Sequence, residues 1–228
     1  MKFTWKTELP ALALMALSIA IAAWAWPHAP DRLPVHWGLN GQSDRWGSPG
    51  EALLQPVGIM ALVYVVFRVL PAFDPGRANY DRFAGAFFTI RLATMGVVLA
   101  MEVMTVAVAL GHSLPVNTWV MSAVGVLMIV LGNVMGKLRP NWFMGIRTPW
   151  TLSSKLAWSK THRAGGWLFV LCGVLLIVTG LLAPDQAAWV AGIALGGCVL
   201  GLVVYSYWVW RSDPDRVPPA GTLPANGS

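Results

Sequence analysis

The chain has 228 residues, of which 56% are hydrophobic and only 11% are charged, with 13 tryptophans and a mean hydropathy of +0.60. A soluble core of this size cannot hide so much apolar surface, so the composition excludes a soluble globular protein and indicates an integral membrane protein. The formal net charge of +6 would suggest nucleic acid in a soluble protein. Here nearly all basic residues flank apolar segments, where anionic lipid headgroups explain them, so we expect no direct nucleic-acid partner.

The first apolar segment, from about Leu9 to Trp26, is long enough to cross a bilayer as a helix. A cleavable signal peptide is the competing interpretation, because Ala23-Trp24-Ala25 resembles a cleavage site. Glu8 and Pro10 make a poor n-region, so a retained signal-anchor helix is favoured. Either interpretation places the next loop outside the cell.

The outer loop, residues 27–51, is rich in proline, glycine and asparagine. Val35-His36-Trp37 and the residues around Trp46 flank Gly38-Leu39-Asn40-Gly41, where Asn-Gly favours positive φ. This pattern predicts a small hairpin-like extracellular lobe.

The next two apolar segments cover about residues 52–70 and 83–111. Glu102 lies inside the second of these, and a carboxylate at membrane depth is costly unless it is protonated, paired or turned into the bundle. Arg91 is three helical turns away, about 16 Å along the axis, which is too far for a direct pair. Two interpretations stay open: a protonated Glu102 bonded to a neighbouring helix, or a proton or ion relay.

Three more apolar segments cover about residues 119–134, 167–182 and 187–210, with Asn133 near the inner end of the first. Cys172 and Cys198 fall inside apolar runs, so we expect packing residues rather than a disulfide or metal cluster. The tail over residues 213–228 is rich in proline, glycine and serine and is predicted to be disordered.

The central loop, residues 136–166, carries six basic residues and no acidic residue. The excess of Lys and Arg in short loops marks the cytoplasmic side, and with six crossings only Arg32 and Arg45 of the basic residues lie outside. We therefore predict an all-α integral membrane protein with six transmembrane helices, cytoplasmic N and C termini and one extracellular lobe.

Pro140 is predicted to end the helix before this loop, and Thr151 is a good N-cap for a short helix over about residues 152–163. Its mixed faces predict an interfacial cytoplasmic helix lying on the inner leaflet. From pattern alone, a topological connector and a partner-docking surface are equally supported.

Two motifs make the chain recognisable. Asn141, then residues 145–153 (GIRTPWTLS), then Trp158, Thr161, His162 and Arg163, closely resemble the signature loop of the SdpI-type membrane immunity protein family. Leu33-Pro34-Val35-His36-Trp37 through Gly41, Asp44, Trp46 and Gly47 resemble the uncharacterised N-terminal domain often joined to it. We expect an N-terminal membrane region over residues 1–110 and an SdpI-like region over residues 111–212.

The resemblance implies a multipass protein of the bacterial plasma membrane that gives resistance to a secreted antimicrobial peptide toxin and holds a cytoplasmic transcriptional repressor at the membrane. It implies no cofactor. The predicted toxin-facing residues outside are His36, Trp37, Asn40, Asp44 and Trp46. The predicted partner-facing residues inside are Asn141, Gly145, Arg147, Thr148, Pro149, Trp150, Thr151, Trp158, Thr161 and His162. Arg147 could instead clamp a phosphate or a carbonyl, and Thr161-His162 could simply end the interfacial helix.

Two other classes of protein compete with this interpretation. An enzyme or metal site would have to use His28, His36 and Asp44, whose spacing is irregular, so we expect neither an enzyme nor a metal. A small proton- or ion-coupled transporter is the stronger rival, because Glu102, Arg91 and Asn133 could line a path.

Overall fold

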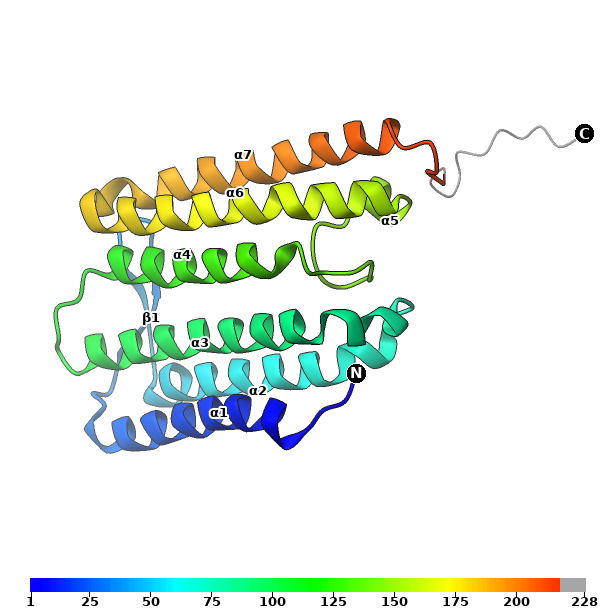
Figure 1. The fold of residues 1–228 in the computed structure, drawn as a ribbon. Helices are drawn as coiled ribbons and strands as arrows, with labels where there is room; N and C mark the ends of the chain where they lie inside the picture. Colours follow the sequence, from blue (N-terminus) through cyan, green and yellow to red (C-terminus); the bar gives the residue numbers. More distant parts are fainter. Residues whose placement is uncertain (218–228) are drawn as a thin grey trace, which may run out of the picture.

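The computed structural model describes residues 1–217 and contains six helices that are long and apolar enough to cross a membrane (Figure 1). They are α1 (Trp5–Ala25), α2 (Pro49–Phe73), α3 (Ala84–Ala109), α4 (Val116–Met135), α6 (Lys155–Leu182) and α7 (Pro184–Arg211). Short helices connect them: η1 (Trp26–His28), η2 (Arg77–Phe83) and α5 (Pro149–Leu152). The predicted all-α, multi-pass membrane protein is confirmed.

The helices form two groups, α1 to α3 and α4 to α7, which meet between α3 and α4. Figure 1 shows α1, α2 and α3 together on one side of the bundle and α6 with α7 on the other, with α4 between α3 and α6. Successive connections alternate between the two ends of the bundle, and the N-terminus and the C-terminal end of α7 lie at the same end (Figure 1). This common end is the cytoplasmic one, because the basic central loop lies there too.

Glycine allows α4 and α6 to pack most closely of all the helix pairs. A Cβ on Gly132 would lie 2.6 Å from the Gly166 carbonyl oxygen, and one on Gly173 would lie 2.5 Å from that of Gly125. Close backbone contact of this kind is how membrane helices associate without a hydrophobic driving force. The resulting rigid pair supports the loop that connects α4 to α6.

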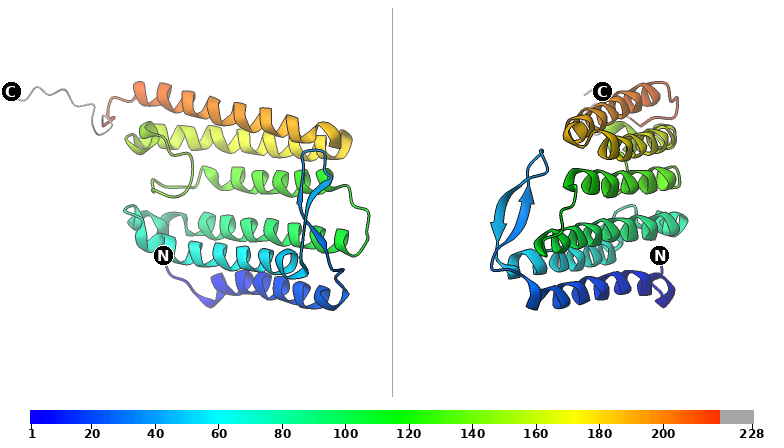
Figure 2. Two further views of the ribbon diagram at one scale, coloured as in Figure 1. Left: turned by 180° about the vertical axis from the view of Figure 1, so that it is seen from behind. Right: turned by 90° about the vertical axis from the view of Figure 1, so that its left-hand side faces the viewer.

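The outer loop folds into the expected hairpin. Strands β1 (Leu33–Trp37) and β2 (Ser43–Gly47) pair antiparallel around a turn in which Gly41 has a φ of +74°. Figure 2 shows the hairpin rising from the level of α2 toward the level of α6. At its tip, Asn117 of α4 donates to the Leu39 carbonyl (3.2 Å) and to the Pro184 carbonyl at the start of α7 (3.1 Å). The hairpin therefore links the two helix groups on the outer side.

The inner end of α6 differs from expectation, because residues 155–163 are not a separate interfacial helix but the first turns of α6. Ser154, not Thr151, caps this helix: its side chain accepts from the Ala157 backbone N–H at 2.9 Å. The buried face of these turns holds Ala157, Thr161 and Gly165, which are small enough for other chain segments to approach closely. The helix consequently packs against protein here and continues into the membrane.

The first residues of the C-terminal tail are held against this region. Asp213 is buried and accepts a hydrogen bond from the Ser154 hydroxyl, and the Val217 N–H donates to the Ser153 carbonyl. Residues 218–228, which make up most of the predicted disordered tail, lie outside the described part of the chain.

Candidate functional site

We call the inner connection between α4 and α6, residues 136–154, the motif loop. The side chain of Asn141, which is only 1% exposed, holds the backbone of this loop together through hydrogen bonds. Its Oδ1 accepts from the backbone N–H groups of Phe143 (3.0 Å) and Met144 (2.7 Å), and its Nδ2 donates to the carbonyls of Arg139 (2.9 Å) and Met144 (3.1 Å). An asparagine amide has two donor positions and a two-lone-pair acceptor, so Asn141 uses its full capacity on the loop backbone.

His162 holds the next part of the loop against α6. Its Nδ1 donates to the Trp158 carbonyl (2.8 Å), and its Nε2 accepts from the Ile146 N–H (3.0 Å), which requires the neutral Nδ1–H tautomer. The ring stacks on Trp158, whose indole N–H donates to the Leu138 carbonyl (3.0 Å). Gly145 fits beside them because its φ is +100° and because a Cβ there would lie 2.3 Å from His162 Nε2.

Thr148 and Thr151 together cap the N-terminal end of the short helix α5. Thr148 Oγ1 accepts from the Thr151 N–H (3.1 Å), and Thr151 Oγ1 accepts from the Thr148 N–H (2.9 Å), which is a reciprocal capping arrangement. The Thr148 hydroxyl also lies 3.0 Å from the Ser206 hydroxyl of α7. Side-chain contacts thus connect the motif loop to α6 through His162 and to α7 through Ser206.

The α2–α3 turn contacts the motif loop from the other helix group. The Trp142 N–H donates to Asp74 (3.1 Å to Oδ2), the Asn79 side chain donates to the Pro140 carbonyl (2.8 Å), and the Tyr80 hydroxyl donates to Asp74 (2.7 Å). Asp74, Asn79 and Tyr80 were not predicted as site residues, because Asp74 and Asn79 bond segments that lie 68 and 61 residues further along the chain. The first helix group therefore holds the loop in place.

The predicted inner site residues divide by exposure. Buried against protein are Asn141, Thr148, Thr151, Trp158, Thr161 and His162. Exposed or half-buried are Gly145, Arg147, Pro149 and Trp150. Arg147 donates from Nη1 to the Trp142 carbonyl, and Trp150 packs edge-on against Tyr207 of α7 with ring centroids 5.3 Å apart.

Exposed aromatic side chains accompany Arg147. Trp142 is 57% exposed and Phe143 is 44% exposed, and neither was predicted as a site residue. We call Trp142, Phe143, Arg147 and Trp150 the inner surface. It combines one guanidinium with three aromatic rings, a composition suited to contact with protein or with lipid headgroups.

The outer site residues all lie on the hairpin. His36 Nδ1 and Asp44 Oδ1 are 2.6 Å apart across the two strands, and both side chains are more than half exposed. Asn40 accepts from the Gln42 N–H in the turn, and Trp46 is 52% exposed. His28 does not join them, because its Nδ1 bonds the Trp24 carbonyl. Residues 1–217 contain no group of three His, Cys, Asp or Glu side chains that could hold a metal.

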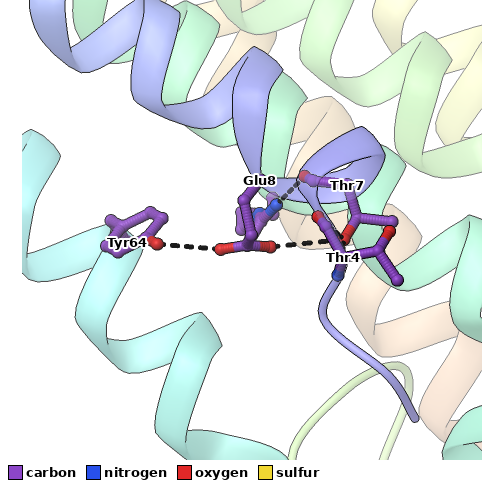
Figure 3. A network of polar contacts seen from close by, with 5 residues as sticks. Thr4, Thr7, Glu8 and Tyr64 are labelled. Carbon is purple, nitrogen blue, oxygen red and sulfur yellow. Dashed lines mark hydrogen bonds and ion pairs between the residues drawn. The ribbon is translucent and has the colours of Figure 1, made fainter.

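The three polar residues predicted within the membrane do not lie together. Arg91 pairs with Glu8 of α1 at 3.0 Å, and Tyr64 of α2 donates to the same carboxylate at 2.8 Å; Figure 3 shows Glu8 between Tyr64 and Thr7. Glu102 lies deeper in the same helix group, fully buried and away from this network. Asn133 is on an exposed face of α4 and donates to its own helix at the Ile129 carbonyl.

These features define a six-helix membrane protein with a folded outer hairpin and a folded inner motif loop. Residues 137–207 match the SdpI/YfhL protein family, and residues 13–71 match a domain of unknown function, DUF1648. The resemblance to the SdpI-type family that the motifs indicated is thus confirmed over residues 137–207. The chain is 22% identical over 173 residues to the Immunity protein SdpI of Bacillus subtilis (strain 168), an alignment that covers 76% of this chain and 81% of that protein. No solved structure matches the chain.

Proposed function

We propose that this protein gives its cell immunity to a secreted antimicrobial peptide toxin and passes the toxin signal to the cytoplasm. The observation that carries the proposal is the two-sided layout. An exposed hairpin outside bonds to α4 at Asn117, and α4 leads directly into the motif loop inside. Similarity to an immunity protein over most of both chains supports the same conclusion.

The toxin-binding surface is the outer face of the hairpin. His36, Asp44 and Trp46 present a hydrogen-bonded polar pair and a large ring to the outside, and Asn40 lies at the tip near Leu39, which is 63% exposed. Such a mixture of charge and aromatic surface suits an amphipathic peptide. Trp37 is the last residue of β1, directly before the turn.

The inner surface is where a cytoplasmic repressor would be held. Trp142, Phe143 and Arg147 are exposed, whereas the motif residues Asn141, Thr148, Thr151, Trp158, Thr161 and His162 are buried, so the buried residues act by shaping the loop. The test is to follow a fluorescently tagged candidate repressor that is co-expressed with this chain. Toxin should move it to the membrane with the intact protein, and movement that persists in the Arg147→Ala variant would contradict this role.

Protection should depend on the inner surface and not on Glu102. In a Bacillus subtilis strain that lacks its own immunity protein SdpI, the chain should restore survival against that strain's secreted peptide toxin. Arg147→Ala should abolish survival, because hydrogen bonds to a charged group contribute about 1.5–3 kcal/mol, which is about a ten- to hundredfold change in affinity. Trp150→Ala should abolish survival too, because it removes the ring that packs edge-on against Tyr207 of α7.

Lys137→Ala is the matched control, because it removes another exposed cation on the same side of the membrane. It should leave survival unchanged, as should Glu102→Gln. Survival that withstands Arg147→Ala and Trp150→Ala but is lost with Glu102→Gln would instead favour a proton- or ion-coupled transporter. The buried, unpartnered carboxyl of Glu102 is the one observation that favours that second candidate.

A further inference from the structure

Glu102 differs from the other two glutamates in the chain. Glu8 pairs with Arg91 at 3.0 Å, and Glu51 pairs with Arg45 at 2.6 Å. Glu102 makes no ion pair with any described residue, and neither of its carboxyl oxygens has a hydrogen-bond partner there. It is nonetheless completely buried.

The surroundings of Glu102 are apolar and closed. It lies on α3 between two clusters of buried side chains, one containing Ala11, Met60 and Met95 and the other containing Ala22, Leu53 and Val106. The one polar side chain facing it is Ser18 of α1, which is also completely buried and without a hydrogen-bond partner. Two buried polar groups without hydrogen-bond partners, one from α1 and one from α3, therefore lie in the same apolar region.

No described charge neutralises a carboxylate at this position. Arg91 on α3 is three turns away and is occupied by Glu8 of α1. On α2, Tyr64 bonds Glu8, Arg68 lies over the ring of Phe3, and Glu51 pairs with Arg45 at the outer end. On the hairpin, His36 is turned to Asp44. An ionised Glu102 would be an uncompensated buried charge, which proteins avoid by neutralising the group.

We propose that Glu102 and Ser18 form a proton-binding site inside the α1–α3 helix group. The ligand is a proton: Glu102 is a neutral carboxylic acid at neutral pH, and its O–H donates to the Ser18 oxygen after a small rotation of either side chain. One hydrogen bond then satisfies both orphaned groups and joins α3 to α1 in the membrane. Release of the proton requires water to enter between these helices. The site is separate from the motif loop and does not depend on the proposed immunity function.

Infrared spectroscopy of the full chain in lipid vesicles tests the site directly. Exposed carboxyls are ionised at neutral pH, so a C=O stretching band of a protonated carboxyl should come from Glu102. The band should shift when the glutamates carry a ¹³C-labelled carboxyl group, a test on the unmutated protein that distinguishes them from the seven aspartates. Glu102→Gln should remove the band, and Glu51→Gln, which changes a partly exposed glutamate at the outer end of α2, should leave it.

Ser18→Ala tests the partner. The band should persist and move to higher frequency, because the acid loses its acceptor. A band that does not move would overturn the role of Ser18. Absence of any band that shifts with ¹³C-glutamate at neutral pH, or a band unchanged by Glu102→Gln, would show that Glu102 is ionised and would overturn the proton site.

Discussion

Replacing Glu8 by glutamine should destabilise the protein by about 3–5 kcal/mol, because removal of one member of a buried ion pair leaves the other charge uncompensated. The remaining charge would be Arg91, whose side chain is fully buried and whose guanidinium bonds both Glu8 and the Thr7 carbonyl. The glutamine amide keeps one acceptor oxygen, so it cannot accept from the Tyr64 hydroxyl and from Arg91 through two separate oxygens as Glu8 does. The thermal midpoint of the purified protein in detergent should fall well below that of the unmodified chain.

Two further variants separate loss of charge from loss of packing. Tyr64→Phe removes one hydrogen bond to the same carboxylate and should cost only about 1–3 kcal/mol. The double variant Glu8→Gln with Arg91→Met should recover much of the stability lost in Glu8→Gln, since no unpaired charge remains. A Glu8→Gln midpoint equal to that of the unmodified chain would show that the pair does not hold α1 to α3.

Gly145→Ala should unfold the motif loop and abolish protection. The residue has a φ of +100°, and an added Cβ would lie 2.3 Å from His162 Nε2, so the hydrogen bond between His162 and the Ile146 N–H cannot survive. Backbone strain and overpacking together should cost at least about 2 kcal/mol. Limited trypsin digestion of inside-out vesicles should show faster cleavage after Lys137 and Arg147, and survival against toxin should be lost.

Gly136→Ala is the control for this variant. It lies at the start of the same loop with a negative φ, and a Cβ there meets nothing within 4 Å. Digestion and survival should match those of the unmodified chain. If Gly145→Ala is as resistant to trypsin as Gly136→Ala, the hydrogen bonds of His162 do not maintain the loop.

The six helices and the hairpin were predictable because they depend on local properties. Apolar length sets a membrane span, and an Asn-Gly turn between short strands sets a hairpin. The prediction of a separate interfacial helix was wrong, because Ser154 caps a single helix, α6, that continues to Leu182. A change from polar to apolar composition along a helix does not show where the helix bends or whether it rests on lipid or on protein.

The pairings were not predictable, because they join distant segments. Glu8 appeared in the sequence only as an acidic residue before an apolar run, yet it is the partner of Arg91, 83 residues later. Likewise Asn141 and His162 were predicted to face a cytoplasmic partner, yet both are buried. A tight loop has many backbone donors and acceptors that need partners, and these two side chains turn inward to satisfy them.

The central claim is that the hairpin faces the outside of the cell and the motif loop faces the cytoplasm. Single cysteines at Asn40 and Lys155 test it, since the native Cys172 and Cys198 are buried. A membrane-impermeant maleimide should label Asn40→Cys in intact cells and should label Lys155→Cys only after the cells are permeabilised. Labelling of Lys155→Cys in intact cells, with Asn40→Cys protected, would contradict the orientation and the two-sided mechanism built on it.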